Sequence, residues 1–481
     1  MQDFKYVGLD ILTQAASTRR YSFLFLSQLA YNSEILSKFA KQRTIKHINM
    51  KTLRTLATLL FATITFTANA QEGAWNGELD VMGTKLPLDF NFTTNGCTMD
   101  SPSENAKGIP AEKTVTDDGT IKVKVGMIGA TFEGKMANGE IKGTFTQNGF
   151  PLPLTLKPGK ITVKRPQTPV PPFPYKEESV SFTNAGYTFN GTLTLPENYT
   201  KDTPVVLMVT GSGQQNRDEE MFEHKPFAVI ADALARQGIA SLRYDDRGWG
   251  DARSVKFINF TVEDFCEDAA AAIPLLRKRF SKVGVLGHSE GGTIAMMLAA
   301  EGKADFIVSL AGMAISGKET LVMQNRQAMS AIGLPKETVD TYCNSISKAL
   351  DEIASGKKAS EINIDGMPEA LKPITIKSLQ QADTPYIRHF LNVDVSELLS
   401  KIKCPVLALN GTKDTQVDCT ANTIQLERGL TNCKHTIKKV DGVNHLFQHC
   451  TTGNVVEYQQ IEETIAPEVL QTITGWINSE L

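Results

Sequence analysis

Apolar and polar residues alternate along residues 71–165 with the two-residue period of half-buried strands. In residues 86–92 four large apolar side chains alternate with Pro, Asp and Asn. Four dipeptides that tolerate the positive φ angles of tight turns separate such runs: Asn95-Gly96, Asp118-Gly119, Asn138-Gly139 and Asn148-Gly149. We therefore predict a small antiparallel β domain over residues 71–165, a meander or partial barrel. It carries no catalytic constellation, which favours a packing or binding appendage.

Residues 176–481 show a different pattern, in which apolar runs of strand length alternate with helical segments. The predicted strands are 205–211, 239–245, 282–287, 306–312 and 404–411, and the predicted helices are 226–238, 261–280 and 293–302. This alternation predicts an α/β fold with a doubly wound, mostly parallel sheet. Residues 313–400 interrupt it with helical sequence, which we interpret as a cap insertion. Five prolines lie in residues 166–174 and predict a stiff linker over residues 166–175 between the two domains.

Residues 50–70 have the three parts of a secretory signal peptide. Lys51 and Arg54 precede the uncharged run 55–67, and Ala68-Asn69-Ala70 fits a cleavage site that leaves Gln71 as the first residue. The run is shorter than the ~20 residues that span a bilayer, which argues against a stable membrane anchor. We expect an exported protein, periplasmic or secreted. Residues 1–49 are then a mis-assigned upstream extension or, alternatively, part of an unusually long leader.

Charge and cysteine usage exclude some classes of protein. The formal net charge of −3 does not suit a nucleic-acid binder that relies on a basic surface. The seven cysteines lack CxxC or Cys/His ligand spacing, so we expect no metal site. Their odd number leaves at least one thiol unpaired in a monomer.

The strongest chemical motif is Gly287-His288-Ser289-Glu290-Gly291, which follows an apolar strand and precedes a helix of small residues. This is the setting of a G-x-S-x-G nucleophile elbow, in which a sharp turn lifts the serine hydroxyl above the sheet. We predict Ser289 as a nucleophile. A serine hydroxyl needs a histidine base, and that histidine needs an orienting carboxylate.

His445 lies in a loop after the segment 435–440 and is the predicted base, with His449 as a nearby alternative. Asp414 follows the strand 404–411 and is the predicted acid, and Asp418 is its rival. The chain order Ser289, Asp414, His445 is the order of an α/β-hydrolase triad.

A tetrahedral oxyanion needs backbone donors. We expect one from the N–H of Glu290 and the other from the glycine-containing loop after residues 205–211, through Gly213 or Gln214.

Two loops of mixed charge follow the strands at 205–211 and 239–245. Their predicted participants are Arg217, Asp218, Asp245 and Arg247. We favour internal Arg–Asp pairing that holds the site's architecture, and a substrate-carboxylate site is the alternative.

As a set, the motifs of residues 176–481 resemble a bacterial exported esterase group of the α/β-hydrolase superfamily, related to serine aminopeptidases and dienelactone hydrolases. The supporting segments are GSGQQNRDE (211–219), RYDDRGWGDA (243–252), GHSEGG (287–292), TPYIRHFLNVD (384–394), CPVLALNGTKDTQV (404–417) and GVNHLF (442–447). The resemblance implies the same triad, no metal and no organic cofactor. The chain departs from the pattern at Gln215, where many members have Pro, and at Asp394, which no proline follows.

The expected function is therefore a serine hydrolase that cleaves small-molecule carboxylic esters through an acyl-enzyme intermediate. The alternatives are a peptidase or acyl-aminoacyl hydrolase with the same triad and a non-catalytic protein that binds glycan or lipid. We expect no nucleic-acid partner, and the residues carry no signal for the oligomeric state.

Overall fold

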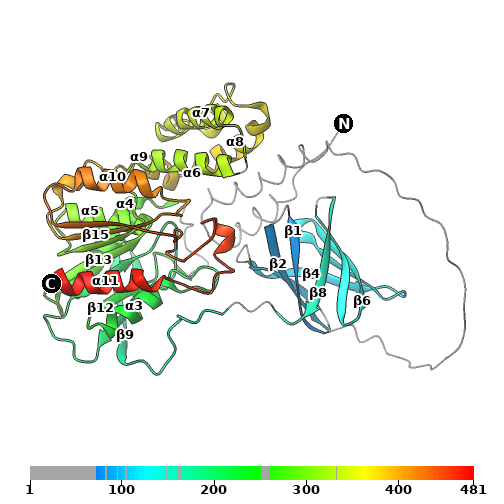
Figure 1. Cartoon of the computed structure of the whole chain (residues 1–481), viewed down its shortest axis with the longest axis horizontal. Helices are drawn as coiled ribbons and strands as arrows, with labels where there is room; N and C mark the ends of the chain where they lie inside the picture. The colour runs from blue at the N-terminus through cyan, green and yellow to red at the C-terminus, as the bar shows by residue number, and fades with distance from the viewer. Residues whose placement is uncertain are drawn as a thin grey trace, which may run out of the picture. The chain divides into compact units, whose positions relative to one another are not determined.

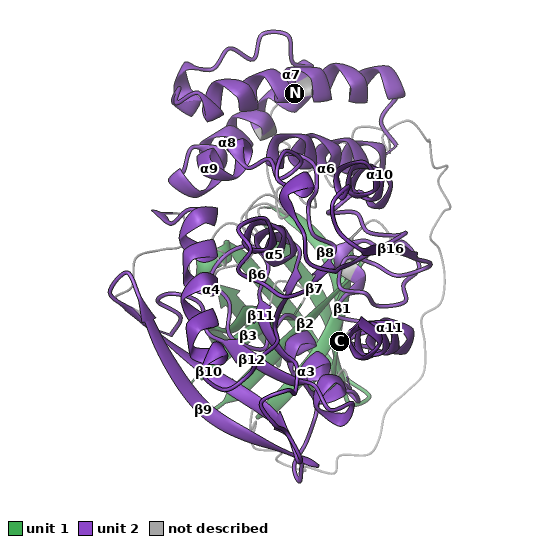
Figure 2. Ribbon diagram, turned by 90° about the vertical axis from the view of Figure 1, so that its left-hand side faces the viewer, with its two compact units in different colours: residues 1–19, 25–162 green, residues 20–24, 163–481 purple. Residues whose placement is uncertain are grey.

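The computed structural model describes residues 72–81, 84–94, 96–102, 106–147, 149–160, 164–250, 259–331 and 333–480. The predicted signal peptide and upstream extension lie outside these residues and stay predictions. The chain divides into two compact units after Thr162 (Figure 2). Each unit is described by itself below.

The first unit is a closed antiparallel barrel in which each strand pairs with the next along the chain. Its strands are β1 (Gly73–Val81), β2 (Thr84–Thr93), β3 (Gly96–Ser101), β4 (Ala106–Val115), β5 (Thr120–Val125), β6 (Ala130–Ala137), β7 (Glu140–Gln147) and β8 (Phe150–Pro158). Pairing of Trp75 with Pro158 closes it between β1 and β8. The small antiparallel β domain is thus confirmed, and the barrel is closed rather than partial.

Alternation in the strands explains the barrel core. In β5 the apolar residues Ile121, Val123 and Val125 are buried and the lysines between them are exposed. The inward apolar side chains form one cluster, which includes Phe90, Phe132 and other residues of all eight strands. Pairing of β1 with β8 leaves no free edge strand among the described strands of this unit, which protects a strand-rich domain from edge-to-edge association.

The second unit is built on an eight-stranded sheet of order β16-β15-β14-β13-β11-β12-β10-β9. The strands are β9 (Tyr175–Asn184), β10 (Tyr187–Pro196), β11 (Val205–Val209), β12 (Ala240–Tyr244), β13 (Val283–His288), β14 (Ile307–Leu310), β15 (Val406–Gly411) and β16 (His435–Val440). The pairs from β12 to β16 are parallel, and β10 is antiparallel to both of its neighbours. The predicted doubly wound, mostly parallel sheet is confirmed.

Every residue of the central strands β11, β13 and β15 is buried, because helices cover both faces of this sheet. In Figure 1, α3 (Pro226–Arg236) and α11 (Pro467–Glu480) lie on one face, and α4 (Val262–Arg277), α5 (Glu290–Ala300) and α10 (Cys419–Gly429) lie on the other. Helix α4 starts with a capping box, since Thr261 N donates to Asp264 Oδ2 at 2.7 Å and Asp264 N donates to Thr261 Oγ1 at 3.1 Å. Helix α5 begins at Glu290, three residues before the start expected from the sequence.

The insertion at 313–400 is helical, as predicted. It contains α6 (Gly317–Ala331), α7 (Lys336–Ala354), α8 (Lys372–Ala382) and α9 (Pro385–Asn392), which gather beyond one side of the sheet in Figure 1. Helix α9 begins at the N-cap Thr384, whose hydroxyl accepts from Ile387 N at 3.3 Å. This helix returns the chain from the insertion toward the sheet.

The proline-rich segment belongs to the second unit rather than lying free between the two. The Arg165 guanidinium donates to the carbonyl groups of Phe222, Gln459 and Ile461. The Gln167 side chain donates to Ile465 O at 2.7 Å and accepts from Thr464 N and Ile465 N. The proline content of the segment predicts its stiffness. It does not indicate which distant backbone groups the Arg165 and Gln167 side chains bond.

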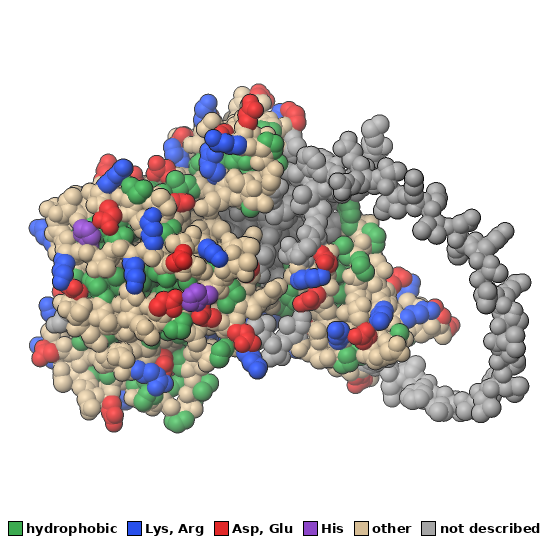
Figure 3. All heavy atoms as spheres, in the orientation of Figure 1, with side chains coloured by type: hydrophobic (Ala, Val, Ile, Leu, Met, Phe, Trp, Pro, Cys, Tyr) green, Lys and Arg blue, Asp and Glu red, His purple; other side chains and the backbone are tan. Residues whose placement is uncertain are grey.

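Acidic and basic side chains are interspersed over the visible face of the molecule (Figure 3). All seven cysteines lie in the described residues and are free thiols. None of the helices in the described part of the chain is both long and apolar enough to cross a lipid bilayer.

Candidate active site

Ser289 sits at the turn between β13 and α5, where the chain reverses from strand to helix. Its φ of 54° and ψ of −120° lie outside the regions that a non-glycine residue ordinarily occupies. Its backbone N–H donates to Leu310 O at 2.8 Å, and its carbonyl accepts from Gly292 N at 2.9 Å. The surrounding structure therefore maintains a strained residue, and strain of this kind clusters at functional sites.

Two glycines make this turn possible. A Cβ on Gly287 would come within 1.9 Å of Gly291 O, and a Cβ on Gly291 would come within 2.0 Å of Val209 O. Both approaches are to backbone atoms, which cannot swing away. The glycine spacing of the motif is thus required by the close crossing of β13, α5 and β11.

Asp414 and His445 meet at the carboxyl ends of β15 and β16. Asp414 Oδ2 lies 2.7 Å from His445 Nδ1, and both side chains are buried. The other carboxylate oxygen, Oδ1, accepts from Gln416 N at 2.7 Å and Val417 N at 2.9 Å. The carboxyl group is therefore oriented by two backbone donors, and Nδ1 of the histidine is directed to it. This arrangement leaves Nε2 as the nitrogen available to act as a base.

The rivals of these two residues have structural partners elsewhere. Asp418 is the N-cap of α10, where its Oδ1 accepts from Ala421 N at 2.7 Å. His449 is exposed. Its Nδ1 lies 2.9 Å from Glu463 Oε1, and its Nε2 lies 2.9 Å from Glu468 Oε1. The hydrogen bonds just described for Asp418 and His449 do not involve Asp414 or His445.

A second buried carboxylate–imidazole pair lies behind Ser289. His288 Nδ1 is 3.0 Å from Glu219 Oε1, and His288 Nε2 is 2.9 Å from the carbonyl oxygen of His445. Burial lowers the pKa of His288, but the Glu219 carboxylate, together with the His445 carbonyl and the charge of Asp414, raises the pKa overall. The residue next to the serine thus supports the backbone of His445 and places the two chain segments side by side.

The loop after β11 is fixed at several backbone groups. Gly211 N donates to Glu219 Oε1 at 2.6 Å, and Gln215 N donates to Asp246 Oδ2 at 2.6 Å. A Cβ on Gly211 would lie 3.4 Å from Ser289 Cβ, so this loop passes directly beside the serine. The Gln214 side chain donates to Arg247 O at 2.5 Å. The two predicted donor positions, Gly213 and Gln214, therefore lie in a firmly held segment.

Glu290 and Gly213 are both linked to Tyr386 of α9. The Tyr386 hydroxyl lies 2.5 Å from Glu290 Oε2. Burial, followed by the interaction with Glu290, raises the pKa of Tyr386, while hydrogen bonds from the Ser212 side chain and the Gly213 backbone act in the opposite sense.

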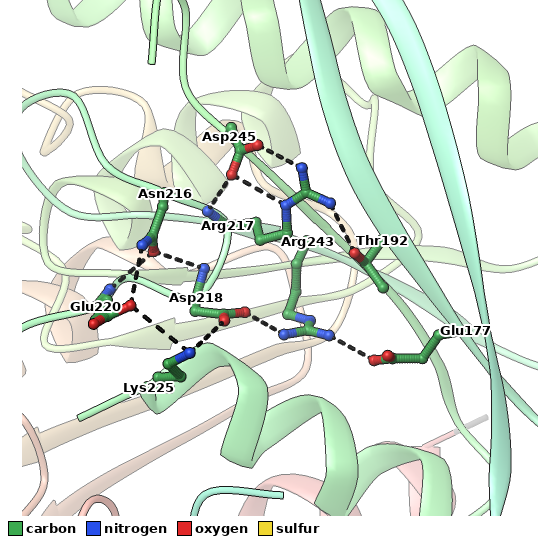
Figure 4. A network of polar contacts seen from close by, with 9 residues as sticks. All are labelled: Glu177, Thr192, Asn216, Arg217, Asp218, Glu220, Lys225, Arg243 and Asp245. Atoms are coloured by element: carbon green, nitrogen blue, oxygen red, sulfur yellow. Dashed lines mark hydrogen bonds and ion pairs between the residues drawn. The ribbon is translucent and has the colours of Figure 1, made fainter. Parts of the chain in front are cut away.

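The charged side chains of the two loops form hydrogen bonds and ion pairs with one another (Figure 4). Arg217 donates to Asp245 through both its guanidinium and its backbone N–H, the latter at 2.8 Å. Arg243 bridges Asp218 and Glu177. The residues that complete this network are Thr192, Asn216, Glu220 and Lys225. These contacts join the loop after β11 to the loop after β12 and to β9 and β10.

Arg247 forms a separate buried pair. Its guanidinium binds both oxygens of Asp268 of α4, at 2.6 and 2.8 Å, and also contacts Asp264. It lies over the rings of Tyr187 and Phe260 at 5.3 and 5.0 Å. A bidentate and stacked guanidinium is a demanding fit that a lysine could not reproduce.

Replacing Arg247 with methionine is expected to lower the free energy of unfolding of the second unit by about 3–5 kcal/mol, because it leaves Asp268 buried without its cation. Urea unfolding followed by tryptophan fluorescence measures the change. Arg236→Met is the matched control, since Arg236 is 52% exposed and pairs with Asp232 on a helix surface. We expect it to cost about 0–1 kcal/mol. Equal costs for the two variants would show that the Arg247 pair is not a structural centre.

Three residues of this site were not singled out as site residues from the sequence. Glu219 and Tyr386 lie inside segments that supported the family resemblance, but their roles depend on partners far away in the chain. Asp246 also belongs to such a segment, and its buried carboxyl ties the loop after β11 to the loop after β12. The only sequence signal for them is membership of a motif-like segment.

Comparison with known proteins gives a family match and one curated relative. Residues 223–354 match the family described as serine aminopeptidase, S33. The chain is 30% identical over 275 residues to esterase EstD of Thermotoga maritima, an alignment that covers 56% of this chain and spans 60% of the length of that protein.

Solved structures also align with the chain, at lower sequence identity. Est1E of Butyrivibrio proteoclasticus aligns with 63% of this chain and 98% of its own, with a TM-score of 0.39 and 15% identity. Proline iminopeptidase of Mycobacterium smegmatis gives the same identity, coverage and TM-score.

Proposed function

We propose that the chain is a serine hydrolase of the α/β-hydrolase superfamily that cleaves carboxylic esters, with Ser289 as nucleophile, His445 as base and Asp414 as the orienting acid. The observation that carries this proposal is the buried 2.7 Å contact between Asp414 and His445. The carbonyl oxygen of His445 lies 2.9 Å from Nε2 of His288, and the next residue, Ser289, is held at positive φ on a strand-to-helix turn. The 30% identity to a protein named as an esterase supports the same bond type.

The proposed reaction has two halves. His445 Nε2 takes the proton of the Ser289 hydroxyl as its oxygen attacks the acyl carbonyl, and the carbonyl electron pair moves onto oxygen. Collapse of this tetrahedral intermediate breaks the bond to the alkoxy group, which leaves with the proton from His445. Water then repeats the sequence on the acyl-enzyme and releases the acid. Asp414 stabilises the imidazolium that forms in each half.

Charge on the tetrahedral oxygen is met by backbone N–H groups in the proposed mechanism. Glu290 is the first residue of α5, so its backbone N–H has no acceptor within the helix and lies at the positive end of the helix dipole. Of the two candidates in the loop after β11 we favour Gln214, because the Gly213 amide interacts with the Tyr386 hydroxyl. Removing one such donor typically costs ~10²–10³ in rate.

A peptidase or acyl-aminoacyl hydrolase is the second candidate. The matched family is described as a serine aminopeptidase, and the same triad can cleave amides. An amide requires the amine to be protonated as it leaves, so the two activities differ in how the site holds the leaving group.

The test uses the purified full chain. Hydrolysis of p-nitrophenyl esters from acetate to palmitate is compared with hydrolysis of the matched p-nitroanilides, and a fluorophosphonate probe is mapped by mass spectrometry. We expect turnover of esters well above that of anilides and a label on Ser289. Faster anilide turnover would favour the peptidase. A folded protein that shows neither turnover nor label would refute the hydrolase proposal.

A further inference from the structure

The Glu290 side chain has no part in the proposed reaction, which uses only the backbone N–H of this residue. Its carboxyl group is nevertheless buried beside the nucleophile, with the residue only 2% exposed. Burial raises the pKa of Glu290 to about 7, and the hydrogen bond with Tyr386 opposes the rise. A buried carboxyl is costly unless it is partnered. The buried Glu290 carboxyl therefore needs a hydrogen-bond partner, and that partner is the basis of the role argued below.

The partner comes from a third element of the fold. Tyr386 lies in the first turn of α9, at the end of the helical insertion, and its side chain is buried. Its ring packs edge-on against Phe265 at 6.4 Å and is stacked with Phe390 at 6.5 Å. The N-cap Thr384 fixes the helix start two residues earlier. The hydroxyl is therefore delivered to the elbow by a constrained ring rather than by a mobile side chain.

One hydroxyl group connects both sides of the proposed oxyanion hole. It donates to the Glu290 carboxyl, on the α5 side, and on the side of the loop after β11 it interacts with the Gly213 backbone amide and the Ser212 side chain. Gly213 has a φ of 91°, so the loop turns sharply at this residue. The next amide along the loop is Gln214, the favoured second donor.

We propose that Tyr386 is a positioning residue of this site, whose hydroxyl fixes the loop after β11 against the first residue of α5 so that two backbone N–H groups converge on one substrate oxygen. This inference rests on the proposed ester hydrolysis. Preorganised donors stabilise charge that develops only in the transition state, so misplacing them lowers kcat more than it raises KM. The helical insertion then does more than cover the site, since it supplies one of the contacts that shape it.

The experiment measures kcat and KM for p-nitrophenyl butyrate with the full chain and its Tyr386→Phe variant. We expect kcat to fall by about 10- to 100-fold, below the loss for a deleted donor, with KM changed by less than about threefold. Tyr342→Phe is the matched control, because Tyr342 is a buried tyrosine of the same insertion whose hydroxyl bonds Asn325 at 3.0 Å, within the insertion. We expect Tyr342→Phe to retain wild-type kcat.

A second pair of variants guards against misfolding of Tyr386→Phe. Glu290→Leu breaks the same link from the other side, and the double variant should lose no more activity than the worse single variant. Multiplying losses would mean that the two side chains act separately and would overturn the proposal. So would a Tyr386→Phe kcat within threefold of wild type. An inactive wild-type protein would instead refute the proposed ester hydrolysis.

Discussion

Replacing Ser289 with alanine is expected to abolish ester hydrolysis and fluorophosphonate labelling together. Loss of a triad serine removes the covalent route, and in a serine protease such a loss lowers kcat by about 10⁶-fold. The variant should fold, because alanine removes one oxygen and creates no new contact at the elbow. Initial rates with p-nitrophenyl esters and gel fluorescence after labelling measure the two effects.

A matched control is available in the neighbouring strand. Ser309 of β14 is also a buried serine, only 2% exposed. The Ser309→Ala variant should therefore keep both the label and the turnover. Residual labelling of Ser289→Ala at the wild-type rate would show that another residue is the nucleophile.

Replacing Asp414 with asparagine is expected to lower kcat by about 10⁴-fold with little change in fold. The asparagine oxygen can still accept from Gln416 N and Val417 N, which now occupy Asp414 Oδ1. Its NH₂ group then faces His445 Nδ1 and holds the imidazole in the tautomer that carries the proton on Nε2. That histidine can no longer take the proton from serine. Steady-state kinetics and circular dichroism, measured on the same preparation, separate activity from folding.

Asp418→Asn is the control for this variant. Asp418 caps α10, and asparagine is an equally good N-cap, so both stability and activity should stay near wild type. If Asp418→Asn rather than Asp414→Asn loses activity, the acid has been misassigned. Equal and small effects would mean that His445 is oriented by a group other than Asp414.

Local patterns in the sequence were sufficient for much of the fold. The two-residue period predicted the β domain, since inward and outward side chains alternate whatever the partner strand is. Whether the strands close into a barrel depends on β1 meeting β8, and these strands are far apart in the chain. The sequence pattern of each strand is the same in an open meander, so closure could not be predicted from it.

For the candidate site, too, the sequence predicted some features and not others. The residues Ser289, Asp414 and His445 were predicted from their position after strands, because parallel strands bring their carboxyl ends to one sheet edge. The turn at Ser289 was also predictable, since glycine spacing reports the close approach of backbones. The sequence pointed to Glu290 and Gly213 through their backbone groups alone.

The sequence by itself therefore determined the set of helices and strands, the order in which the candidate site residues follow the strands, and the type of residue at each turn. Only the tertiary structure decided how side chains from distant segments meet. The Glu219–His288 pair and the contact of Tyr386 with Glu290 each join residues separated by dozens of positions. Such contacts depend on the packing of whole elements, and a buried hydrogen-bond partner leaves no periodic mark on the sequence around it.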